Sequence, residues 1–212
     1  ETVRPNPSIQ EGRCSGGYAR GSYDTRTKGK TKRRSNGWTA EGVVEHTDRG
    51  FLKSDFSYTY LRGKVIRYQT TTPSGWLSAE GRGGASIRPL PPHRLFDVGG
   101  GPDFYFPFGV LRGVPFDWFQ GDRFAAFLID YHFGGRAFKG VPFPKVSLAD
   151  MFEVIGFADV AWSSLSARSR AMATDEALRT TDGIYAEVGV SVAERRDYFR
   201  FDVMLQRGDG RP

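Results

Sequence analysis

Residues 198–205 read Tyr-Phe-Arg-Phe-Asp-Val-Met-Leu, and apolar side chains occupy every second position. Successive side chains of an extended chain point to opposite sides, so one face of this segment is entirely apolar and the other carries an arginine and an aspartate. The apolar face consists of Phe199, Phe201, Val203 and Leu205. This alternation predicts a strand in a sheet whose two faces differ.

The same period of two extends outward along the chain and is equally clean in residues 76–85. The composition agrees with strands, because the chain holds 27 glycines and 14% aromatic residues while helix-forming runs are scarce. We therefore predict an all-β, antiparallel protein with eight strands. They are expected at residues 17–27, 37–46, 51–68, 76–85, 122–133, 152–163, 183–193 and 198–205.

Alternation by itself fits two kinds of protein, because the apolar face can pack against a soluble core or against lipid. Three features favour a transmembrane β-barrel. The strands are about ten residues long, as crossing a bilayer at a tilt requires. Connections of very different lengths, such as 70–75 and 88–121, are typical of barrels. Tryptophans at strand ends match interfacial aromatic girdles, namely Trp38, Trp76 and Trp162.

In the barrel interpretation, one face of each strand contacts lipid. The lipid-facing side chains are predicted to include Phe127, Ile129, Phe199, Phe201 and Val203. The alternative is a soluble all-β domain that binds a carbohydrate or a lipid. Solubility without detergent would distinguish the two.

The net charge of +6 for 212 residues is concentrated in one segment. Between Arg20 and Asn36 there are seven basic residues and one acid, which equals the whole surplus. A nucleic-acid-binding face usually spreads its positive charge more widely, so we expect no nucleic-acid partner. The segment instead predicts a basic rim beside lipid phosphates. Its central members are Lys28, Lys30, Lys32, Arg33 and Arg34.

Other classes of protein are excluded by simple counts. No apolar run approaches the ~20 residues of a membrane-spanning helix, and the lone Cys14 excludes a disulfide framework within the chain. A chain beginning at Glu1, with no apolar leader, is expected to be processed or to be a segment of something longer.

The long connection contains an ordered set of short motifs. Residues 95–102 read Leu-Phe-Asp-Val-Gly-Gly-Gly-Pro, residues 110–116 read Val-Leu-Arg-Gly-Val-Pro-Phe, and residues 121–124 read Gly-Asp-Arg-Phe. Two strands follow, with Phe-Leu-Ile-Asp-Tyr at 127–131 and Gly-Phe-Ala-Asp-Val-Ala-Trp at 156–162. This set resembles the bacterial surface antigen family, the outer-membrane barrels of the BamA and TamA type.

The resemblance covers residues 37–206 and is strongest from 95 to 162, although Val114, Val160 and Ala161 depart from the family pattern. It implies that the long loop folds into the lumen and that its arginine is held by acidic residues of the inner wall. Arg112 and Gly113 would be the loop anchor, and Asp130 and Asp159 its partners.

The parity of the strands supports these partners independently. If the apolar residues around Asp130 and Asp159 face lipid, both carboxylates point into the lumen, where they repel one another unless a cation neutralises them. A guanidinium suits that role better than an ammonium. A metal shared by Asp130, His132 and Asp159 is the less favoured interpretation, and we expect no metal and no cofactor.

The resemblance also implies a function and a division of the chain. It predicts a bacterial outer-membrane protein that assembles other outer-membrane proteins or translocates polypeptides. Its partners would be outer-membrane lipid, unfolded polypeptide cargo and accessory assembly proteins. Residues 1–16 would be irregular, 17–206 a barrel segment with a lumen-folding loop at 88–121, and 207–212 a loop or truncated end.

Family members have about sixteen strands, so eight suggest the C-terminal half of such a barrel without its last strand. A small closed barrel of eight strands is the alternative. Nothing in the sequence predicts an enzyme, since no Gly-x-Ser-x-Gly elbow, Walker-type loop or His-Glu-x-x-His motif is present.

Overall fold

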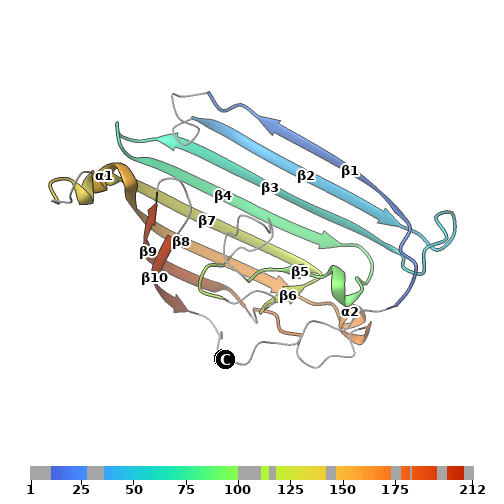
Figure 1. The fold of residues 1–212 in the computed structure, drawn as a ribbon. Coiled ribbons are helices and arrows are strands. Elements are labelled where there is room, and N and C mark those ends of the chain that lie inside the picture. Colours follow the sequence, from blue (N-terminus) through green and yellow to red (C-terminus); the bar gives the residue numbers. More distant parts are fainter. Residues whose placement is uncertain are drawn as a thin grey trace.

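The computed structural model describes residues 11–27, 36–99, 111–114, 118–141, 147–172, 178–181, 183–194 and 200–207. Eight antiparallel strands form one sheet, in which the order across the sheet follows the order along the chain (Figure 1). The predicted all-β, antiparallel class is confirmed. The strands of this sheet are β1 (Gly16–Asp24), β2 (Gly37–Thr47), β3 (Tyr58–Thr70), β4 (Trp76–Ser86), β7 (Arg123–Gly134), β8 (Phe152–Ser164), β9 (Tyr185–Glu194) and β10 (Arg200–Arg207).

Each predicted strand has a counterpart, and the largest error is the start of β3, which begins at Tyr58 rather than at residue 51. A local turn explains the difference. The Asp48 side chain accepts a hydrogen bond from the Phe51 amide (2.9 Å), and the Asp48 carbonyl accepts one from the Ser54 amide (3.0 Å). These bonds satisfy backbone groups that would otherwise pair in a sheet.

Short elements fill the connections. A two-stranded sheet and small helical turns lie beside the main sheet: β5 (Phe96–Asp97), β6 (Gln120–Gly121), η2 (Pro92–Arg94), η3 (Gly135–Phe138), α1 (Leu148–Met151) and α2 (Ala167–Met172). Within the described residues, no helix has the length and apolar character needed to cross a membrane.

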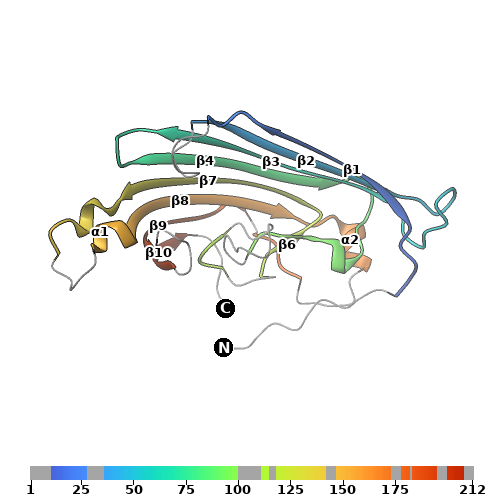
Figure 2. The ribbon, with the colours of Figure 1, turned by 45° about the horizontal axis from the view of Figure 1, so that its top comes forward.

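β1 and β10 are the two edges of the sheet, and no pairing between them is present among the described residues. Figure 2 shows the sheet as an arch, with the connection that holds β5 and β6 under its concave side.

The two faces of the arch have opposite character. On the concave face, the pairing register aligns charged and polar side chains with buried ones, such as Asp159 opposite Leu128 and Glu187. The convex face is apolar and exposed. Its exposed large side chains include Trp38, Val44, Leu61, Val65, Phe127, Phe133, Val160, Trp162, Val188, Val190, Phe201, Val203 and Leu205.

The side chains predicted to face lipid lie on this convex face wherever the structure describes them. Phe127 is 47% exposed, Phe201 65% and Val203 63%. Ile129 shares the face of Phe127 and is half-buried, while Phe199 lies outside the described residues.

The hydrophobic core lies between the concave face and the segments that cross it. One cluster joins the crossing segments to β7, β8 and β9, and it consists of Val98, Leu111, Val114, Phe119, Ala126, Leu128, Ala161 and Tyr185. A second cluster, Phe56, Tyr58, Leu90 and Phe96, lies beside β3. The crossing chain is therefore packed against the sheet as part of the fold.

Gly84 allows this close packing. A Cβ at Gly84 would lie 2.5 Å from the Phe96 ring and 2.6 Å from the Phe124 ring, whereas a Cβ at Gly81 on the convex face would meet nothing within 4 Å. Only the absence of a side chain at position 84 lets the two rings approach β4.

We expect Gly84→Ala to lower the free energy of unfolding by about 1–3 kcal/mol, because the added methyl group overpacks the Phe96 and Phe124 rings. Gly81→Ala is the matched control and should leave stability unchanged or slightly higher. Equilibrium denaturant unfolding, followed by near-UV circular dichroism, measures both. Equal midpoints for the two variants would contradict the packing described here.

Candidate functional site

Residues 111–114 rest on the concave face near its centre. The Leu111 amide donates to the Val98 carbonyl (3.1 Å), and the Val98 amide donates to the Phe119 carbonyl (2.9 Å). Leu111 is fully buried and Val114 is 5% exposed. These contacts fix the backbone on both sides of Arg112 and direct its side chain along the sheet.

The Arg112 guanidinium is buried against acidic residues of two neighbouring strands. Its Nη2 atom donates to both carboxylate oxygens of Asp130 on β7, at 2.6 and 2.8 Å. Its Nε atom lies 3.6 Å from Oδ2 of Asp159 on β8. The Arg112 side chain is 3% exposed and that of Asp159 is fully buried, so solvent screens these charges little.

An aromatic ring supports the guanidinium from the sheet side. The central carbon of the Arg112 guanidinium lies 4.3 Å from the centre of the Phe157 ring. A cation over the face of an aromatic ring at this distance is stabilised by the negative charge of the ring face. Phe157 thus supports the guanidinium above β8 and leaves its N–H groups free to bind the carboxylates.

Glu187 on β9 binds the backbone of the same segment. Its two carboxylate oxygens accept hydrogen bonds from the Arg112 amide (2.5 Å) and the Gly113 amide (3.0 Å). Gln206 on β10 donates from its side-chain nitrogen to the Gly113 carbonyl (2.7 Å). Residues 112–113 are therefore held by four consecutive strands, β7 to β10. We call Arg112, Gly113, Asp130, Asp159 and Glu187 the anchor cluster.

The anchor cluster is electrostatically unbalanced in favour of negative charge. Asp159 lies directly opposite Glu187 in the β8–β9 register, and Asp130 lies one strand away. Two carboxylates, Asp130 and Asp159, face the Arg112 guanidinium, and a third, Glu187, binds the backbone amides beside it. Like charges at this separation in a buried site repel strongly. The fold consequently depends more on Arg112 than on any single carboxylate.

The structure brings together all four residues expected at the loop anchor, namely Arg112, Gly113, Asp130 and Asp159. Sequence reasoning missed the contributions of Phe157, Glu187 and Gln206. For Glu187 a signal existed, since it occupies an inward position of a predicted strand. The register that sets it beside Gly113 could not be read from the sequence.

Asp122, which begins the predicted strand after the loop, organises a second contact between loops. Its carboxylate accepts from the Ser166 amide (3.2 and 3.1 Å) and from the Ser169 hydroxyl (2.7 Å), just before and within α2. The Leu90 amide in turn donates to the Ser169 hydroxyl (3.3 Å). Asp122 thereby ties the long loop to the β8–β9 connection.

Two of the three tryptophans predicted for the interfacial girdle, Trp38 and Trp162, lie on the convex face. Trp38 is the second residue of β2, and Trp162 lies near the end of β8. The two strands run in the same direction, so these residues mark opposite ends of the convex face. Trp38 is 47% exposed and Trp162 39%, and the Arg67 guanidinium lies 5.3 Å from the Trp38 ring centre.

Trp76 lies elsewhere, and its assignment to the interfacial girdle is corrected. It is on the concave side, stacked on the His132 ring at 3.5 Å between ring centres. His132 also contacts Glu153 (3.1 Å between Nδ1 and Oε1). His132 is thus engaged with Trp76 and Glu153, and the part of the chain that the structure describes contains no group of three metal ligands.

The predicted basic rim, Lys28, Lys30, Lys32, Arg33 and Arg34, lies outside the described residues. Its two flanks are described. At one flank Arg26 binds Asp24 (2.6 Å) and lies 5.3 Å from the Tyr68 ring centre. The other flank leads into Trp38 at the start of β2.

The chain matches no protein-family model and no curated protein sequence. The anchor cluster pairs the Arg112 guanidinium with Asp130 and Asp159 and holds a loop against the sheet. Nε and Nη1 of Arg112 and both carboxylate oxygens of Asp159 are buried without a hydrogen-bond partner among the described residues.

We expect Arg112→Met to lower the free energy of unfolding by about 3–5 kcal/mol, because it leaves the fully buried Asp159 carboxylate and the partly buried Asp130 carboxylate without the guanidinium that faces them. Asp159→Asn keeps the volume and reduces the repulsion, so it should change stability by less than about 1 kcal/mol. Denaturant unfolding measures the difference. Limited proteolysis should show faster cleavage within residues 98–119 for Arg112→Met only. Equal losses for the two variants would contradict the charge imbalance.

Proposed function

We propose that the chain is an outer-membrane β-barrel segment of the surface-antigen type, which takes part in outer-membrane protein assembly or polypeptide translocation. The observation that carries this proposal is the reversed polarity of the sheet. Its concave face, covered by the crossing loop, holds the charged side chains, and its convex face is apolar and exposed.

In water, this arrangement is unfavourable. Apolar side chains recur on alternate positions of neighbouring strands and are 40–77% exposed at Val44, Val160 and Leu205, among others. Soluble monomers rarely expose a continuous apolar surface of more than a few hundred Å². Contact with lipid tails removes the cost, while polar residues on the other face line a hydrated interior.

The dimensions of the strands support the same proposal. The eight strands contain between 8 and 13 residues, and the typical tilted membrane strand needs ~9–11. The convex face carries tryptophans at both ends, as an outer-membrane barrel does at its two interfaces.

The charges of the connections add an orientation. The connections at one end of the sheet are residues 25–36, 71–75, 135–151 and 195–199, and together they carry eleven basic and two acidic residues. Those at the other end are residues 48–57, 87–122 and 165–184, with eight basic and nine acidic residues. If the long loop is extracellular, as the family resemblance implies, the basic end faces the phospholipid headgroups of the periplasmic leaflet.

Two observations support a role in assembly or translocation. They are the ordered motifs of the long loop and the anchor cluster, which fixes part of this loop to the sheet. A loop fixed to β7–β10 couples the interior to the β10 edge. An edge strand with unpaired backbone groups is a template for another strand, either of the same barrel or of a polypeptide being inserted.

Adjacent positions of β3 provide a direct test. We expect Val65→Arg, on the convex face, to make membrane insertion less favourable by about 2–4 kcal/mol, because it places a charge against lipid tails. Ile66→Arg is the matched control on the concave face, opposite Glu80, and should insert normally. Folding into phosphatidylcholine vesicles is measured by heat-modifiable electrophoretic mobility and by protection from protease.

If the protein is instead a soluble ligand-binding domain, it will purify as a monomer without detergent, and Val65→Arg at a 46% exposed position will be harmless. Either result would overturn the membrane proposal. Expression of the whole protein in a Gram-negative host, with outer-membrane fractionation, tests its location independently.

A further inference from the structure

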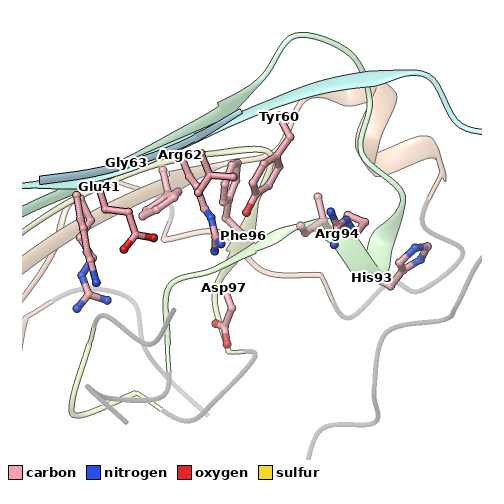
Figure 3. A pocket seen from close by; sticks show the side chains of 13 residues that line it. Glu41, Tyr60, Arg62, Gly63, His93, Arg94, Phe96 and Asp97 are labelled. Atoms are coloured by element: carbon pink, nitrogen blue, oxygen red, sulfur yellow. The ribbon is translucent and has the colours of Figure 1, made fainter. Parts of the chain in front are cut away.

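A pocket of about 280 Å³ lies between the concave face of β2–β4 and the crossing segment His93–Asp97, away from the anchor cluster. Figure 3 shows the side chains of Tyr60 and Arg62 pointing from the sheet toward this segment, with Phe96 and Arg94 on the far side. The volume is just below the ~300–1,000 Å³ typical of small-molecule sites, so a small ligand fits.

The apolar part of the pocket is a fixed aromatic stack. The Tyr60 and Phe96 rings are stacked at 4.5 Å between centres with 19° between their planes, and Phe124 lies 4.8 Å from Phe96. Phe96 is only 4% exposed, and Gly84 gives the rings their close seat on β4. This stack is present before any ligand binds, and its partly buried members, Tyr60 and Phe124, offer apolar surface to a planar group.

The polar part of the pocket is predominantly basic. Its charged lining residues are Arg62, Lys64, Arg82 and Arg94, against Glu41 and Asp97. His93 adds no charge at pH 7, since burial and the neighbouring Arg94 cation lower its pKa further below neutrality. The electrostatic potential of the lining therefore favours an anion.

Lys64 is the cation that the fold leaves available. It lies opposite Glu41 on one side and opposite Arg82 on the other. Glu41 binds Arg20 instead (3.0 Å), and Arg82 forms an ion pair with Glu80. Within the described part of the chain, the Lys64 ammonium has no ion-pair or hydrogen-bond partner. Lys64 and Arg82 are like charges directly opposite each other, and such a pair destabilises a sheet. Stability of the sheet alone therefore gives no reason for a lysine at position 64.

Asp97 and Arg94, the charged residues of the crossing segment, bind other groups. The Asp97 carboxylate accepts from the Gly99 amide (2.8 Å), and Arg94 is paired with Glu45 and lies 3.2 Å from the Tyr58 hydroxyl. These bonds hold the crossing segment in place and leave Lys64 facing the cavity.

We propose that this pocket binds a small organic anion with a planar apolar part, such as an aryl phosphate or an aromatic carboxylate. The ring packs against Tyr60, Phe96 and Phe124, and the anionic group binds the Lys64 ammonium beside Arg62 and Arg82. The site is separate from the anchor cluster and does not depend on membrane insertion or on polypeptide handling.

The test uses the folded full chain and fluorine NMR. The probes are 4-fluorophenyl phosphate, 4-fluorobenzoate and the neutral 4-fluorobenzyl alcohol, with a protein-free sample of the same buffer or detergent as the blank. We expect saturable line broadening for an anionic probe, weakened by added salt because charge attraction is screened. The ratio of the two anionic affinities distinguishes a phosphate ligand from a carboxylate ligand.

Variants locate the binding. Lys64→Met keeps the apolar stem and should weaken the anionic probe by about tenfold or more. Lys139→Met is the matched control, because Lys139 is exposed at the end of η3, away from the pocket. Absence of saturable binding, equal binding of the neutral probe, or equal affinities of the two variants would each overturn the proposal.

Discussion

Neutralisation of buried acids by Arg112 is the constraint on which the loop and its side of the sheet depend. Asp130, Asp159 and Glu187 come from three different strands and meet beneath the loop. Without a cation, these strands would carry mutually repelling charges in a place that water scarcely reaches. The arginine arrives from a segment remote in sequence, so the sheet and the loop stabilise one another.

This constraint explains why the charged face of the sheet is the enclosed one. Ion pairs such as Arg200 with Asp202 (2.7 Å) and Arg20 with Glu41 (3.0 Å) satisfy the polar side chains of the concave face. The described part of the convex face displays Val, Phe and Leu instead. The membrane environment proposed above would account for this distribution of charged and apolar side chains.

Strand positions and faces were largely predictable because a period of two is a local signal. The same parity placed Asp130 and Asp159 on one face, and both lie on the concave face beside Arg112. The same parity puts Trp76 on the face of Glu80 and Arg82, which is inconsistent with its assignment to the interfacial girdle. Register, in contrast, depends on turn geometry and on distant packing, so the approach of Glu187 and Gln206 to Gly113 was not predictable. The pocket beside Lys64 escaped notice for the same reason, since its two walls are joined only by the fold.

The strictly sequential order of the strands has a consequence for timing. Each strand of the sheet pairs only with its neighbours along the chain, so hairpins can form one after another as the polypeptide emerges. The loop segment is different, because its hydrogen bonds join residues far apart in the sequence. Arg112 binds Glu187, 75 positions later, and Gly113 binds Gln206, 93 positions later. The loop can therefore be fixed to the sheet only after β9 and β10 have joined it.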